Sequence, residues 1–175
     1  MEIYLVRHTI PDIAQGICYG QTDIALSAEF EQHAKMIIKY LPRSVEAVFS
    51  SPLLRCTLLA KKLPYSLNVH TDSRLLEMNF GEWEMKKWDT INSQEPWFAD
   101  YINTTVPGGE SYYQLYIRVT DFLKDVKKSR LQKVVIITHG GVIKAAMSAL
   151  KLISLEEALM FDVQFGSIHH FFLDD

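Results

Sequence analysis

Apolar residues along the chain fall into two repeating patterns. Short runs rich in Ile, Val and Phe occur at residues 3–7, 46–51, 133–138 and 167–175, and each has the composition of a β-strand. A weaker run of the same kind lies at residues 68–72. The run KVVIIT at 133–138 is almost continuous in β-branched residues, as expected of a parallel strand that is buried on both faces.

The second pattern is apolar residues at helical spacing, and it alternates with the strands. In residues 28–41 the apolar positions recur every three or four residues, and Ser27 is the expected N-cap. Pro52 suits the first position of a helix with Ser51 as its cap, which predicts a helix over residues 52–63. Two further helices are predicted at residues 112–128 and 142–152.

Strands that alternate with helices predict an α/β fold, a three-layer sandwich around a mostly parallel central sheet. We expect one domain over residues 1–175. Residues 85–107 interrupt the alternation with polar and aromatic residues, among them Trp88 and Trp97, and Pro96 breaks any long helix there. This segment, called the lid below, is expected to be a small helical excursion.

The composition is that of an ordinary globular protein and excludes several classes. The 175 residues are 48% hydrophobic and 22% charged, with a net charge of −3, so we expect neither disorder nor nucleic-acid binding. No apolar run is long enough for a membrane span, and a strand near residue 2 leaves no room for a signal peptide. Cys18 and Cys56 lack metal-site spacing and are too few for a disulfide framework. We therefore expect a cytoplasmic protein, either a monomer or a homodimer.

Four unusual side chains are predicted to meet at one edge of the sheet. Arg7 and His8 end the first strand, Arg55 lies in the first turn of the next helix, and His139 ends the buried strand. Ligands of such sheets bind beyond the carboxyl ends of the strands. Two guanidiniums, two imidazoles and the backbone amides at the start of the helix that follows Gly140 and Gly141 would suit a dianion, and phosphate is the obvious candidate.

Each of these residues also has a plainer explanation. Arg7 alone could be a solvated cation at a strand end, and Arg55 alone could be a surface residue of a helix. His139 is harder to explain in this way, because the Gly-Gly pair that follows it indicates a site that needs open backbone. The coincidence of all four favours a site.

Five sequence blocks carry a resemblance to a known family. In chain order they are LVRH, SSPLLRC, LLEMNFGEWE, PGGES and ITHGG, and together they extend from Tyr4 to about Gly141. This ordered set resembles the histidine phosphatase superfamily, also called the phosphoglycerate mutase-like fold. The resemblance implies a phosphatase that acts on a small-molecule phosphomonoester.

The resemblance also implies roles for individual residues. His8 would be the nucleophile that forms a phosphohistidine, while Arg7, Arg55 and His139 would hold the phosphoryl oxygens. Glu77 would protonate the leaving oxygen and then deprotonate the attacking water. Neutral imidazole is a competent nucleophile near pH 7, and fixed positive charge stabilises the transition state, so no metal or other cofactor is expected.

Other residues near these blocks are candidates for further roles at the site. Glu82 and Glu84 are close enough in sequence to Glu77 to share its role. Tyr19 and Gln21 are candidates for the mouth of the substrate pocket. Most members of the family have a phosphate-contacting Asn near position 14, where this chain has alanine, and Gln15 or Gln21 could replace it.

The opening RHTIPDIAQGICYGQTD resembles one subgroup of the family, the alpha-ribazole phosphatases, which remove the 5′-phosphate of alpha-ribazole phosphate in cobalamin biosynthesis. Six aromatic side chains in and just after the lid could stack on the flat base of that substrate, namely Trp88, Trp97, Phe98, Tyr101, Tyr112 and Tyr113. Packing of the lid onto the sheet is the more common role of such residues and would account for most of them. The alternatives are a broad-specificity sugar-phosphate or nucleotide phosphatase, a phosphoglycerate mutase, and a module that binds phosphorylated ligands without turnover.

Overall fold

The computed structural model describes residues 1–65 and 68–173, which form a five-stranded sheet. The strands are β1 (Glu2–Arg7), β2 (Ala47–Ser50), β3 (Val69–Thr71), β4 (Lys133–Thr138) and β5 (Ile168–Phe172), in the order β3-β2-β4-β1-β5. Neighbouring strands are parallel except for β5, which runs antiparallel to β1. The prediction of a mostly parallel sheet is therefore confirmed.

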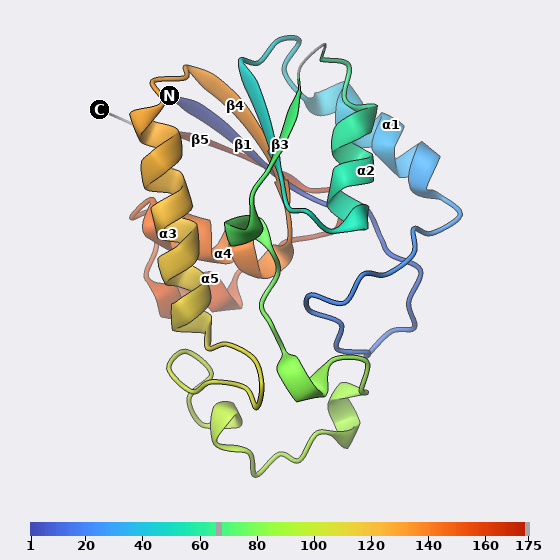
Figure 1. Ribbon diagram of the computed structural model, residues 1–175, viewed down its shortest axis with the longest axis vertical. Coiled ribbons are helices and arrows are strands. Elements are labelled where there is room, and N and C mark those ends of the chain that lie inside the picture. Colours follow the sequence, from blue (N-terminus) through green and yellow to red (C-terminus); the bar gives the residue numbers. More distant parts are fainter. Residues whose placement is uncertain (66–67, 174–175) are drawn as a thin grey trace.

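Helices cover both faces of the sheet, as Figure 1 shows. The helices are α1 (Phe30–Tyr40), α2 (Leu54–Lys62), α3 (Tyr112–Lys128), α4 (Gly140–Ala149) and α5 (Leu155–Met160). Val135 and Ile137 of β4 pack with α1 and α2, while Val134 and Ile136 pack in a second core with α3 and α4. Because β4 is buried on both faces, its sequence has no polar alternation, and the predicted three-layer sandwich is confirmed.

Both helix caps predicted from local sequence are wrong. Helix α1 begins at Phe30, later than predicted. The backbone amide of Phe30 donates to the backbone carbonyl of Ser27, and the hydroxyl of Ser27 does not cap the helix. Helix α2 begins at Leu54, and Asp23 of the loop between β1 and α1 accepts the backbone amide of Leu54 at 2.9 Å. The hydroxyl of Ser51 lies 2.8 Å from a ring nitrogen of His139, and its contact with the backbone amide of Leu53 is long, at 3.5 Å. Tertiary contacts therefore decide both helix starts.

The C-terminal part of the chain differs from the prediction in two further ways. Helix α4 begins directly at Gly140, and α5 is a helix that the hydrophobic pattern did not predict. Its signal is a capping box formed by Ser154 and Glu157. The last strand is shorter than predicted, and residues 174–175 of that prediction lie outside the described part of the chain.

The lid lies at the carboxyl ends of the parallel strands, and Figure 1 shows it at the opposite end of the molecule from the termini. It is helical only as the single 3-10 turns η3 (Trp88–Thr90) and η4 (Pro96–Phe98), so the expected small helical lid is mostly turns. Over residues 1–65 and 68–173, no helix combines the length and apolar character that a membrane crossing requires. Whether the lid and sheet unfold as one domain stays a prediction.

Candidate active site

His8 and His139 meet at the carboxyl ends of two adjacent strands. The parallel register of β1 and β4 pairs Arg7 with Thr138, so the residue that follows each strand lies next to the other. The two imidazole rings are 5.0 Å apart between centroids, and both are almost completely buried. Arg55 joins them from the first turn of α2, with its Nε 3.3 Å from Nδ1 of His139.

The surroundings of His8 determine which of its ring nitrogens has a free lone pair and can act as a nucleophile. Nδ1 lies 2.7 Å from the carbonyl oxygen of Thr9, and because a carbonyl can only accept, Nδ1 carries the proton and donates it to this bond. Burial, followed by the charge of Arg55, holds the pKa of His8 well below its usual value. The ring is therefore neutral near pH 7, and the lone pair on Nε2 is available.

The ring of His139 is held in the opposite tautomer. Arg55 Nε can only donate, so Nδ1 of His139 accepts, and Nε2 donates to the hydroxyl of Ser51 at 2.8 Å. Burial lowers the pKa of His139 as well, and the neighbouring His8 and Arg55 lower it further. A bond from His139 to a phosphoryl oxygen would have to replace one of these two contacts.

Arg55 brings a buried positive charge to this site. Its guanidinium is inaccessible to solvent and donates to the carbonyl oxygens of Gly20 at 2.7 Å and Thr22 at 2.8 Å. The ring of Tyr19 lies 5.2 Å from it. Among the described residues, no carboxylate forms an ion pair with Arg55 or with Arg7. Both charges remain available to an anion.

Arg7 contains a hydrogen-bond donor that lacks a partner. Its Nη1 donates to the carbonyl of Val163 at 2.5 Å, and its guanidinium carbon lies 3.7 Å from the centre of the Phe165 ring. The Nε–H is buried, and within the described part of the chain nothing accepts it. The side chain packs against the start of α4, since a Cβ on Gly140 would lie in van der Waals contact with the guanidinium, at 3.4 Å. An unpaired buried donor beside His8 indicates a missing acceptor.

Glu77 lies at the same site, where its carboxylate contacts the start of α4. It follows the 3-10 turn η1 (Ser73–Leu75), and its carboxylate accepts from the backbone amides of Met78 at 3.0 Å and Gly141 at 3.2 Å. Any Cβ on Gly141 would collide with this carboxylate, which explains physically why glycine occupies that position.

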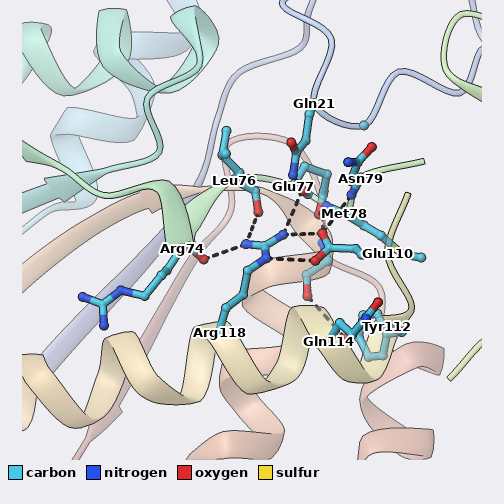
Figure 2. A network of polar contacts seen from close by, with 12 residues as sticks. Gln21, Arg74, Leu76, Glu77, Met78, Asn79, Glu110, Tyr112, Gln114 and Arg118 are labelled. Carbon is cyan, nitrogen blue, oxygen red and sulfur yellow. Dashed lines mark hydrogen bonds and ion pairs between the residues drawn. The ribbon is translucent and has the colours of Figure 1, made fainter. Parts of the chain in front are cut away.

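The backbone of Glu77 is held by an arginine that the sequence analysis missed. Figure 2 shows Arg118 of α3 donating to the carbonyl oxygens of Arg74 and Leu76, both at 2.7 Å, and to that of Glu77 at 3.0 Å. Its counter-ion is Glu110, at 2.6 Å. The available signal was an arginine between Leu115 and Val119, on the apolar face of a predicted helix.

The rim residues predicted from sequence mainly hold other residues in place. The side-chain amide of Gln21 donates to the carbonyl of Glu77 at 2.9 Å. Glu84 accepts from the backbone amides of Gln21 at 2.8 Å and Phe80 at 3.2 Å, and from Thr22. It therefore holds in place the loop at Gly20 and Thr22 whose carbonyls accept from Arg55. Glu82 is exposed to solvent. Glu82 points to solvent and Glu84 is occupied by the backbone amides of the loop, so neither carboxylate is positioned to act at His8.

A cavity of about 350 Å³ opens beside Arg7 and Glu77, and we call it the lid cavity. Its remaining lining consists of Met78, Phe80, Trp88, Trp97, Tyr101, Tyr112, Gly140, Gly141, Lys144, Leu159, Asp162 and Val163. Four of the six aromatic side chains that sequence suggested for ligand contact therefore line it, whereas Phe98 and Tyr113 do not. Across the described residues, no three His, Cys, Asp or Glu side chains are grouped to hold a metal ion.

Comparisons with known proteins agree with this geometry. Residues 3–175 match the family described as the Histidine phosphatase superfamily (branch 1). A protein named "Putative phosphoserine phosphatase 2" from Hydrogenobacter thermophilus is 33% identical over 164 residues, which cover 89% of this chain and 81% of that protein. A "Probable phosphoglycerate mutase GpmB" from Salmonella choleraesuis is 28% identical over 160 residues, covering 86% of this chain and 74% of that one.

Among solved structures, the alpha-ribazole phosphatase from Shigella flexneri superposes with a TM-score of 0.88 at 25% identity, covering 99% of this chain and 91% of that one. The resemblance carried by the five sequence blocks is thus confirmed at the level of the family. The chain belongs to the histidine phosphatase superfamily, and it is a phosphatase.

Proposed function

We propose that this enzyme hydrolyses phosphomonoesters through a phosphohistidine on His8. Nε2 attacks phosphorus, the P–O bond to the alcohol breaks, and the carboxylic acid of Glu77 gives its proton to the leaving oxygen. The Glu77 carboxylate then takes a proton from water as the water oxygen attacks phosphorus. The P–N bond breaks, inorganic phosphate leaves, and His8 returns to its neutral form.

The positive groups around His8 stabilise the transferred phosphoryl group in this proposal. Arg7, Arg55 and His139 would hold its oxygens, together with the amide at Gly140 where helix α4 begins. The observation that carries the proposal is the buried Nε–H of Arg7, which has no acceptor among the described residues and lies beside a neutral nucleophile. A phosphoryl oxygen would satisfy this donor.

For the substrate we propose alpha-ribazole 5′-phosphate, which would place the enzyme in cobalamin biosynthesis and in the cytoplasm. The aromatic lining of the lid cavity supports this choice, because Trp88, Trp97 and Tyr101 could stack on a flat base. The fold shared with the Shigella flexneri alpha-ribazole phosphatase also supports it. Both cysteines, Cys18 and Cys56, are free and buried, which suits a reducing compartment.

Phosphoserine is a second candidate substrate, because the relative at 33% identity carries phosphoserine phosphatase in its name. Transfer to a second alcohol, as in a mutase, and broad activity on sugar phosphates or nucleotides are further alternatives.

The decisive assay measures phosphate release, with excess chelator, from alpha-ribazole 5′-phosphate, phosphoserine, 3-phosphoglycerate, a nucleoside monophosphate and p-nitrophenyl phosphate. We expect a preference for alpha-ribazole phosphate and a loss of at least about 10³-fold in the His8→Ala protein. Trp97→Leu should lower kcat/KM for alpha-ribazole phosphate relative to p-nitrophenyl phosphate by roughly threefold to tenfold. Even activity over the panel would overturn the substrate assignment and keep the mechanism. Full activity in His8→Ala would overturn the mechanism.

A further inference from the structure

The sheet ends on one side in a strand whose outer edge is open. Strand β5 lies next to β1, and within the described part of the chain no strand pairs with its other side. Natural sheets usually protect such an edge with charged residues, with proline or by keeping the strand very short. The five residues of β5, IHHFF, include neither lysine nor proline, and Phe172 is 68% exposed. An edge of this kind is suited to pairing with another strand.

The hydrogen bonds to β1 determine which residues of β5 face the open edge. The backbone amide of Leu173 donates to the carbonyl of Met1 at 2.8 Å, and the carbonyl of Ser167 accepts from the amide of Arg7 at 3.0 Å. In an antiparallel pair, every second residue bonds to the same neighbouring strand. The backbone groups that point away from β1 are therefore those of Ile168, His170 and Phe172.

These three residues are complementary to the same three residues of a second copy. If two β5 strands run antiparallel with His170 opposite His170, Ile168 of each copy lies opposite Phe172 of the other. All three pairs are then of the hydrogen-bonded type, and other registers pair fewer of the outward residues. The imidazole of His170 lies 3.4 Å from the carboxylate of Glu2, so each of the two central rings keeps an acidic neighbour.

The side chains that face the open edge share one face of the sheet with helix α1. Ile168 packs against the core that contains α1 and α2, and the ring of His170 stacks on Tyr4 of the same core, with 4.3 Å between the ring centroids. Phe172 is two residues further along the strand, so its side chain lies on this face as well. Opposite residues of paired strands also share a face, which would bring Phe172 of a second copy beside Ile168 on the α1 side.

On this side Ile168 borders a cavity of about 410 Å³, which we call the edge cavity. Met36 and Tyr40 of α1 and Phe165 of the loop before β5 also line it, and all three are large hydrophobic side chains that are exposed. Exposed apolar surface gathered beside an open strand is typical of a protein interface. Phe165 also lies 3.7 Å from the guanidinium carbon of Arg7, so the edge cavity adjoins the active site.

We propose that the protein forms a symmetric homodimer in which the two β5 strands pair antiparallel about His170, and Phe172 of each copy fills the edge cavity of the other. The two sheets then become one continuous sheet, which covers the open backbone groups and the apolar side chains of both copies. A strand of another protein could use the same backbone groups. The second copy is favoured because β5 itself carries an aromatic side chain at the position opposite Ile168.

Sedimentation equilibrium over a range of protein concentrations measures this association. We expect the wild type to have twice the mass of the chain, and we expect Phe172→Glu to raise the Kd of the dimer by at least about tenfold, because a carboxylate would enter an apolar cavity. Ile117→Glu is the matched control, since it places the same charge on an exposed apolar residue of α3 and should leave the Kd unchanged. Circular dichroism checks that both variants are folded. A monomeric wild type, or an unchanged Kd in folded Phe172→Glu, would overturn the inference.

His170→Cys tests the register of the two strands. Opposite residues of a hydrogen-bonded pair have Cα atoms about 5.5 Å apart, a separation that a disulfide can span. Oxidation with diamide should therefore link the two copies of the His170→Cys protein, whereas Ile117→Cys should stay unlinked. Cys18 and Cys56 are buried and should not contribute. A dimer whose His170→Cys form does not become linked would overturn the proposed strand pairing.

Discussion

The imidazoles of His8 and His139 are buried close to the charges of Arg7 and Arg55, and this decides their protonation. Each ring has one nitrogen committed as a donor, to the carbonyl of Thr9 for His8 and to the hydroxyl of Ser51 for His139. A second proton on either ring would add a positive charge near Arg55 in a site that is buried from solvent. The same features that keep His8 nucleophilic therefore make the fold sensitive to acid.

This sensitivity predicts how stability changes with pH. In the unfolded chain each histidine takes up a proton near its ordinary pKa of 6.5, whereas burial lowers the pKa of His8 and His139 in the folded state. The unfolded state therefore binds more protons below pH 6.5. Their contribution to the free energy of unfolding is complete above this pH and falls as the pH drops toward the lowered folded values. The slope is up to about 1.4 kcal/mol per pH unit for each histidine.

Urea unfolding between pH 7.5 and 5 measures this slope. His139→Asn should make the pH dependence shallower by up to about 1.4 kcal/mol per pH unit, because it removes one of the histidines whose pKa burial lowers, His8, His139 and His169. His70→Asn on β3 is the control, since this histidine is exposed, and it should keep the wild-type slope. Equal slopes in wild type and His139→Asn would show that His139 is protonated in the folded state.

Ser51 is predicted to set the tautomer of His139. Ser51→Ala removes the acceptor of its Nε2 proton, which should cost about 1 kcal/mol of unfolding free energy and lower kcat by roughly tenfold. Nitrogen chemical shifts of the His139 ring should show a mixture of tautomers in the variant. Ser50→Ala deletes a neighbouring serine that is equally buried and bonds only the carbonyl of Ser51, so it should leave the ring signals unchanged.

At the scale of elements, the site is held by contacts between loops. Glu84, just after the 3-10 turn η2 (Gly81–Trp83), accepts from the loop at Gln21 and Thr22, and that loop supplies the carbonyls that hold Arg55. Glu84→Gln turns one acceptor oxygen into an NH₂ that faces backbone donors. We expect a loss of about 2 kcal/mol in unfolding free energy, and roughly tenfold in kcat/KM because Arg55 is less well placed.

Glu82→Gln supplies the matched comparison, because it makes the same change two residues away on an exposed side chain. It should leave both stability and activity within error of the wild type. A loss of activity in Glu82→Gln as large as in Glu84→Gln would mean that Glu82 shares the acid–base role with Glu77. Denaturant titrations and steady-state kinetics on the two variants separate these outcomes.

At the scale of the whole molecule, the lid is joined to the main core by its tryptophans. The chain has three, and Trp83 is only 5% exposed in the same core as β4 and α3, with Trp88 and Trp97 packed against it. The ring centroids of Trp83 and Trp97 are 5.4 Å apart. Tryptophan fluorescence therefore reports on the lid, whereas far-ultraviolet circular dichroism reports mainly on the sheet and its helices.

If the lid and sheet form one domain, these two signals should change together. We expect coincident urea unfolding curves with a single midpoint, because Trp83 cannot leave the core without exposing it. A fluorescence midpoint at clearly lower urea would show that the lid unfolds separately, and the prediction of one domain would then be wrong. Trp97→Leu, which removes only a partly buried ring, should keep the two curves coincident.

The sequence by itself determined the fold class and the groups at the strand ends. Hydrophobic periodicity is a local property, so β1, β4 and the helices between them could be recognised, and parallel strands necessarily bring their carboxyl ends to one edge. This is why His8, His139, Arg7 and Arg55 could be grouped from the sequence alone.

Only the tertiary structure decided the parts that depend on contacts distant in sequence. Arg118 reaches Glu77 across 41 residues, and Ser51 reaches His139 across 88, so neither contact leaves a periodic signal. The cap of α2 from Asp23 and the place of Lys144 in the lid cavity are of the same kind. Periodicity shows which face of an element is buried, but the partner across that face depends on how the elements are assembled.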